Sequence, residues 1–116
     1  MTKNIIAFLL ASITVILTLD AQAQTCTVEK TSVCIDGVCK SMHTSNTWTT
    51  IKNDHLLRCD SKGCDKHAIS ITKSGQYTNV QIPNTSYMLK YDQNLNFIEA
   101  TSLALTIIVN AGKCNH

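Results

Sequence analysis

The chain has few charged residues and no cluster of one sign. It is 116 residues long, with 10 Lys+Arg against 8 Asp+Glu and a formal net charge of +2, and no run of Lys or Arg. A nucleic-acid binder normally carries a clustered basic face, and a polybasic membrane-surface protein carries a basic run. We therefore expect no nucleic acid as a partner. With 44% apolar residues the composition is that of a folded chain, and its length allows one domain.

Motifs of the common enzyme classes are missing too. The sequence holds no Gly-x-Ser-x-Gly elbow, no Gly-rich phosphate loop and no zincin motif. Its histidines (His43, His55, His67 and His116) have no metal-ligand spacing, and its scattered carboxylates are more typical of turns than of a calcium loop. We predict a protein that is not an enzyme, with no catalytic residue, no cofactor and no bound metal.

The first 23 residues have the pattern of a secretory signal peptide. Lys3 precedes an uncharged apolar run from Ile5 to Leu19, which is shorter than the ~20 residues that a membrane span needs. The run ends in Ala21-Gln22-Ala23, a small-x-small cleavage site before Gln24. An uncleaved membrane anchor is the alternative. We expect residues 1–23 to be removed, leaving a periplasmic or secreted domain of residues 24–116 with no stable insertion in the membrane.

All six cysteines lie in that domain, and an even number in a small exported chain is typical of a disulfide framework. Cys34 and Cys39 enclose Asp36-Gly37, a preferred pair for a two-residue type I′ hairpin turn. Such a turn sets the two cysteines opposite each other, close enough for a disulfide.

The other cysteines suggest two further bridges. Cys59 and Cys64 repeat the same spacing around a polar, glycine-containing loop, and Cys26 and Cys114 lie near the two ends of the domain. We favour closing each short loop and joining the ends, although the sequence allows other pairings. A zinc site built from the two C-x4-C pairs is the competing interpretation, and an oxidising compartment argues against it.

The rest of the chain alternates polar and apolar residues with frequent turn signals, which predicts strands and nowhere a helix outside the signal segment. We expect an all-β fold, a small antiparallel meander that forms a barrel or a sandwich and is stapled by disulfides. Trp48 is expected in its core. The predicted strands are 48–51, 55–59, 68–73, 76–82, 87–91, 95–100 and, as the strongest, 103–109.

From Trp48 onward the chain resembles a group of small, secreted, cysteine-containing bacterial proteins. The residues that carry the resemblance are Trp48-x-x-Ile51, Arg58-Cys59-Asp60-Ser61-Lys62-Gly63-Cys64-Asp65, Ser74-Gly75-Gln76-Tyr77 and Gly112-Lys113-Cys114. This group has no characterised activity, so the resemblance implies a location and an architecture only. A looser likeness, of size and architecture alone, is to periplasmic lysozyme and protease inhibitors.

Two functions remain open from the sequence. The first is a non-enzymatic exported binding or envelope-interaction module, inhibitor-like in design, whose partner is an envelope or secreted protein. Lys62 and Asp65, on the loop closed by Cys59 and Cys64, are its candidate recognition residues. The alternative is a small metal-dependent module or enzyme that uses the cysteine loops and His67, suggested by the run Cys64-Asp65-Lys66-His67 beside a turn.

Overall fold

The computed structural model describes residues 23–42 and 46–115. The predicted signal peptide, His43 and His116 lie outside these residues. Within the two described ranges, no helix has the length and apolar character needed to cross a membrane.

The described chain is built from antiparallel strands, which confirms the all-β prediction. The sequence forms strands because β-branched residues recur with a period of two. The strands are β1 (Gln24–Ile35), β2 (Val38–Met42), β3 (Trp48–Ile51), β4 (His55–Asp60), β5 (Gly63–Ala68), β6 (Ser70–Ser74), β7 (Tyr77–Gln81), β8 (Met88–Tyr91), β9 (Asn96–Leu103) and β10 (Thr106–Asn115).

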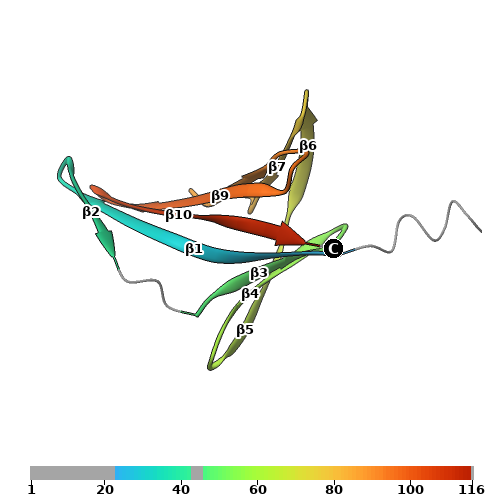
Figure 1. The fold of residues 1–116 in the computed structure, drawn as a ribbon, viewed down its shortest axis with the longest axis horizontal. Coiled ribbons are helices and arrows are strands. Elements are labelled where there is room, and N and C mark those ends of the chain that lie inside the picture. The colour runs from blue at the N-terminus through green and yellow to red at the C-terminus, as the bar shows by residue number, and fades with distance from the viewer. Residues whose placement is uncertain (1–22, 43–45, 116) are drawn as a thin grey trace, which may run out of the picture.

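One sheet curls into a nearly closed barrel. Its strand order is β5-β4-β3-β1-β10-β9-β8-β7-β6, and β2 pairs with β1 beside this path. The two end strands, β5 and β6, follow each other in the chain and are separated only by Ile69, so the chain itself joins the edges of the sheet. The Ile69 N–H donates to the Asp54 carbonyl at 3.2 Å and holds this corner. Figure 1 shows the chain running from β5 directly into β6. The sequence left barrel and sandwich open, and the structure is barrel-like.

The long strand β1 organises the sheet. It pairs with β10 along its length, and on its other side with β3 near its start and with β2 near its end. A bulge between Val28 and Lys30 interrupts the register with β10. Because a bulge adds one residue to one strand, it shifts which residues of β1 face inward. Cys26 and Val28 face the core before the bulge, whereas Thr31 and Val33 continue that face after it.

The core lies on the inner face of the barrel. Leu56, Val80 and Leu89 are fully buried there, together with Phe97 and the Cys26–Cys114 bridge. The predicted alternation in 76–82 is confirmed, since Val80 is buried while its neighbours on β7 turn outward or are half-buried. Burial of these apolar side chains supplies most of the drive to fold.

Three expectations from the sequence are wrong. The run 103–109 is not one strand, because the chain reverses at Ala104 and Leu105 between β9 and β10. The predicted strand 68–73 is broken at Ile69, where the sheet bends. Trp48 is not in the core: it alternates with the buried Thr49 and lies half-buried on the outer face, opposite Cys59.

Candidate functional site

The cysteines form three disulfides, Cys26–Cys114, Cys34–Cys39 and Cys59–Cys64, the pairs that the spacing favours. The first joins β1 to β10, and each of the others closes a hairpin between neighbouring strands. No cysteine is left with a thiol, so none can supply a thiolate ligand for zinc.

The predicted recognition loop lies at the tip of the β4–β5 hairpin. The Asp60 carboxylate accepts hydrogen bonds from the N–H groups of Lys62 and Gly63, at 2.8 and 3.2 Å, and so holds the turn. The Lys62 and Asp65 side chains are exposed. His67 lies further along β5, half-buried opposite Leu56. The part of the chain that the structure describes holds no group of three His, Cys, Asp or Glu residues able to bind a metal.

A buried carboxylate, which the sequence did not single out, ties several strands together. Glu99 on β9 is 2% exposed. Its Oε1 accepts hydrogen bonds from Arg58 at 3.1 Å and Asn110 at 2.9 Å, and its Oε2 accepts from the Tyr87 hydroxyl at 2.5 Å. Thr49 on β3 donates to the same Oε2 over a longer 3.4 Å. We call Glu99 and these four donors the carboxylate hub.

The surroundings of the hub explain how a charge is tolerated in the core. A buried carboxylate must be paired with an opposite charge and fully hydrogen-bonded. Arg58 supplies that charge. The Arg58 guanidinium also lies 5.2 Å from the centre of the Tyr87 ring. Burial, and then the neighbouring Glu99 charge, raise the pKa of Tyr87 well above its usual range. Tyr87 therefore remains a neutral donor. The hub cross-links β3, β4, β9 and β10.

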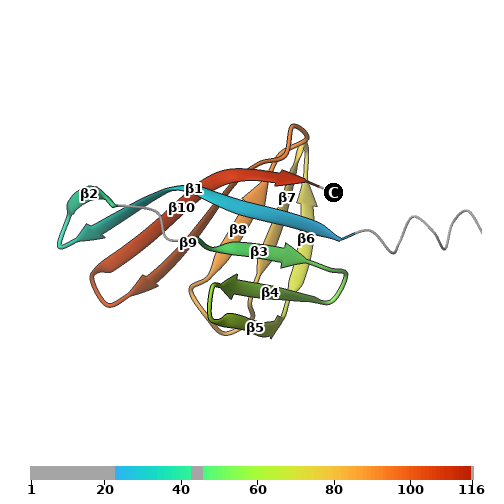
Figure 2. The ribbon, with the colours of Figure 1, turned by 60° about the horizontal axis from the view of Figure 1, so that its bottom comes forward.

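Beyond the hub, four strands continue out of the barrel as an arm. We define the arm as residues 31–42 and 101–109, which comprise the outer parts of β1, β9 and β10 and the whole of β2. Both views of the ribbon show it projecting away from β3–β5 and β6–β7 (Figures 1 and 2). Its two hairpin tips are joined by a hydrogen bond from the Asp36 N–H to the Leu105 carbonyl at 3.2 Å.

The arm carries most of the exposed large hydrophobic side chains among the described residues. Val38 is 62% exposed and Leu103 is 75% exposed. The others on the arm are Ile35, Met42, Leu105, Ile107 and Ile108. Monomeric proteins rarely gather so many apolar side chains on one projecting element, and such gatherings mark interaction sites.

One face of the arm is the outward continuation of the barrel's inner face. Cross-strand pairing aligns Thr31 with Asn110 and Glu99, then Val33 with Ile108, as one moves toward the tip. The inner face thus changes from buried and polar at the hub to exposed and apolar on the arm. Beside β2 this face forms a groove of about 370 Å³, lined by Val33, Ile35, Val38, Lys40, Ser41 and Met42.

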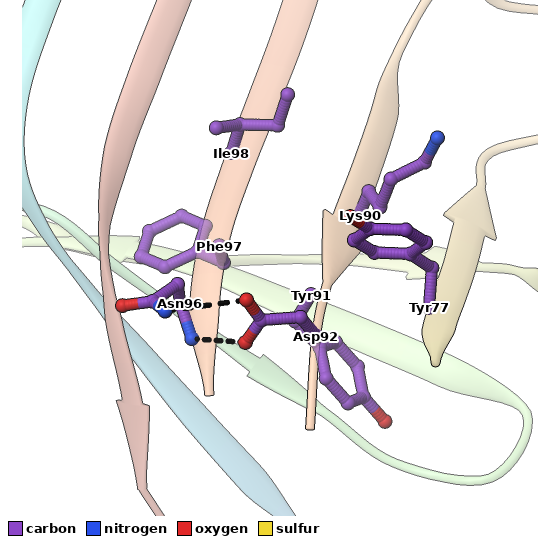
Figure 3. Close-up of a pocket in the computed structure, with 7 residues that line it drawn as sticks. All are labelled: Tyr77, Lys90, Tyr91, Asp92, Asn96, Phe97 and Ile98. Carbon is purple, nitrogen blue, oxygen red and sulfur yellow. Dashed lines mark hydrogen bonds between the residues drawn. The ribbon is translucent and has the colours of Figure 1, made fainter. Parts of the chain in front are cut away.

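A second hollow lies at β7, β8, β9 and the turn between β8 and β9 (Figure 3). Lys90 lies over the Tyr77 ring at 5.4 Å, and the Asp92 carboxylate accepts hydrogen bonds from the N–H and the side-chain amide of Asn96 at 3.0 and 3.2 Å. These bonds lower the pKa of Asp92. At about 170 Å³ the hollow is smaller than the ~300–1,000 Å³ of ordinary ligand pockets. Its one carboxylate, Asp92, is already satisfied by Asn96, so the hollow is a weaker candidate than the arm.

Searches against family models, curated proteins and solved structures return no match to this chain.

Sequence reasoning missed the arm because it assigned the apolar residues of 103–109 to a buried strand. The signal for one half of it was present, since Asp36-Gly37 lies between two apolar residues, Ile35 and Val38, and the structure gives Asp36 and Gly37 the positive φ angles of the predicted turn. The second hairpin has no such signal. Ala104 adopts a positive φ of 53°, although it is neither a glycine nor an asparagine, the residues that usually mark such a turn.

Proposed function

We propose that this protein is a non-enzymatic, exported binding module that docks an envelope or secreted protein through its arm. The observation that carries the proposal is the concentration of exposed apolar side chains on the arm, which holds seven of the eleven large exposed ones among the described residues. The barrel acts as the rigid support.

Export is supported by the covalent structure. Three disulfides in so small a chain are typical of proteins that live in an oxidising compartment, because thiols are kept reduced in the cytosol. The apolar run before Gln24 agrees with this location. A periplasmic or secreted protein meets other envelope or secreted proteins, which defines the class of partner.

Rigidity of the arm favours protein recognition. The Cys34–Cys39 bridge fixes the first hairpin, and Ser86 braces the second, since its hydroxyl donates to the Ser102 carbonyl at 2.8 Å and accepts from the Ser102 N–H at 3.0 Å. A preorganised apolar surface loses little entropy on binding, which is how small interfaces reach useful affinity.

Site-specific photo-crosslinking in cells that produce the protein tests this function. A photoreactive residue replaces Val38 or Leu103 on the arm, and Thr72 on the exposed strand β6 serves as the matched control. We expect one discrete crosslinked product from both arm positions and none from Thr72. The same products from all three positions, or a product from Thr72 alone, would refute docking through the arm.

A further inference from the structure

The outer edge of β2 is an unpaired strand edge beside the apolar groove. β2 pairs with β1 on one side, and no other described strand pairs with it. In a hairpin with a two-residue turn, the pair next to the turn exchanges both hydrogen bonds, and bonded and non-bonded pairs alternate from there. Val38, Lys40 and Met42 therefore bond to β1. Cys39 and Ser41 direct their N–H and C=O groups to the open edge.

The groove next to this edge has a single cation in an apolar setting. Lys40 lies between Val38 and Met42 on the same face of β2, opposite Val33 on β1. Neither ion pair found among the described residues involves Lys40. The four methylene groups of a lysine side chain can cover apolar surface while its ammonium group stays available to pair with an acidic group.

We propose that this edge binds an extended segment of the partner protein as an added strand, with an acidic residue of that segment opposite Lys40 and apolar residues two positions to either side. The inference rests on the proposed function and names how the arm would be used. The backbone of the segment would bond to Cys39 and Ser41, and alternate side chains would enter the groove, which is how strand addition combines affinity with specificity.

The register of the added strand explains the acidic residue. Because Cys39 and Ser41 would form the bonded pairs with the segment, Lys40 would lie at a non-bonded pair, where opposite side chains are closest. An acid at that position attracts the ammonium group, and a base repels it. Val38 and Met42 occupy the next positions on the same face and would meet apolar side chains.

A second copy of this chain fits the edge poorly. Antiparallel pairing of β2 with β2 of another copy, in the register with the longest overlap, would set the two Lys40 side chains against each other at a non-bonded pair. Lysine on an exposed edge strand is a known means of preventing self-association. The charge therefore favours a different protein as the occupant.

Nuclear magnetic resonance titration of the mature protein, disulfides intact, tests the inference. The probes are the peptide Ser-Thr-Val-Thr-Glu-Thr-Val-Thr-Ser and the same peptide with Lys in place of Glu. We expect the Glu peptide to bind about tenfold more tightly than the Lys peptide, since one pair attracts and the other repels. The largest shifts should fall on the amide signals of Cys39 and Ser41.

Three variants make the test specific. Lys40→Glu should reverse the preference between the peptides. Ser41→Pro removes an edge N–H without touching the bonds to β1, so it should abolish binding, whereas Ser41→Ala keeps that N–H and should bind like the parent. Unchanged signals from the barrel will show that each variant is folded.

Several results would overturn strand addition. They are no binding of either peptide, equal binding of both in the parent and in Lys40→Glu, or equal binding by Ser41→Pro and Ser41→Ala. Concentration-dependent shifts of the Cys39 amide without peptide would instead identify a second copy as the occupant. Each of these can occur while the crosslinks from Val38 and Leu103 persist, so failure of this inference is distinguishable from failure of the proposed function.

Discussion

Replacing Glu99 with glutamine should destabilise the fold far more than any exposed charge change. The substitution keeps the size of the side chain but removes the charge that Arg58 pairs with, and it turns one acceptor oxygen into a donor facing other donors. The hydrogen bonds from Tyr87, Asn110 and Arg58 are 2.5, 2.9 and 3.1 Å long, whereas the 3.4 Å contact from Thr49 contributes little.

The magnitude follows from burial. Breaking a fully buried ion pair costs ~3–5 kcal/mol, but the Arg58 side chain is 37% exposed, so water relieves part of its loss. One lost charge-assisted hydrogen bond costs roughly 1.5–3 kcal/mol. We expect the free energy of unfolding to fall by ~3 kcal/mol for Glu99→Gln, a large part of the ~5–15 kcal/mol available to a small domain.

Urea denaturation of the mature protein with its disulfides intact measures this change. Asp65→Asn is the control, because Asp65, which lies on β5 opposite Arg58, is exposed and belongs to neither ion pair of the described residues. Its effect should stay within ~0.5 kcal/mol. A fall of less than ~1 kcal/mol for Glu99→Gln would show that the carboxylate hub does not hold the strands together.

Other perturbations test the frame around the hub. Replacing Cys26 and Cys114 together by alanine should lower the free energy of unfolding by ~4 kcal/mol in urea denaturation, because their bridge spans 88 residues and so restricts the unfolded chain. A loss below ~1 kcal/mol would contradict this reasoning. Gly112 lies opposite Val28, where the bulge of β1 begins. Gly112→Ala should destabilise the domain by ~3 kcal/mol or more, since a Cβ there would lie 2.0 Å from the Thr27 carbonyl oxygen. A variant with unchanged thermal stability would show that the bulge does not bring the two strands together at Gly112. Because the pKa of Tyr87 is raised in the folded state, the folded state keeps a proton that the unfolded state loses above pH ~10. The free energy of unfolding should therefore fall as the pH rises beyond that value, by up to ~1.4 kcal/mol per pH unit. Tyr87→Phe should remove this extra slope, and equal slopes in the two proteins would contradict the assignment.

The features that sequence reasoning predicted are those set by near neighbours in the chain. Asp36-Gly37 specifies its turn through the positive φ angles that these residues tolerate. The turn then sets the pairing register of β1 and β2, which places Cys34 opposite Cys39. The alternation around Val80 shows the buried face of β7 for the same reason, because side chains of a strand alternate whatever the strand packs against.

The failures come from interactions between distant segments. Ile107 and Ile108 have the composition of a buried strand, but the chain reverses just before them and neither is covered by the barrel. Trp48 is apolar enough for a core, yet its strand presents Thr49 and Ile51 inward, and both of these residues are buried. Neither choice can be read from a local pattern, because each depends on a partner many residues away.

The sequence by itself determined that the chain folds into antiparallel strands with tight turns, and it indicated the three cysteine pairs. Periodicity, turn chemistry and cysteine spacing act over a few residues, so they can be recognised in the sequence without a structure. Only the tertiary structure decided that the sheet curls into a barrel, that Glu99 is buried among donors from other strands, and that an apolar arm extends beyond the hub. The physical reason lies in β1. Its bulge shifts the inward face by one residue, so Thr31 and Val33 continue the barrel's inner face onto the arm.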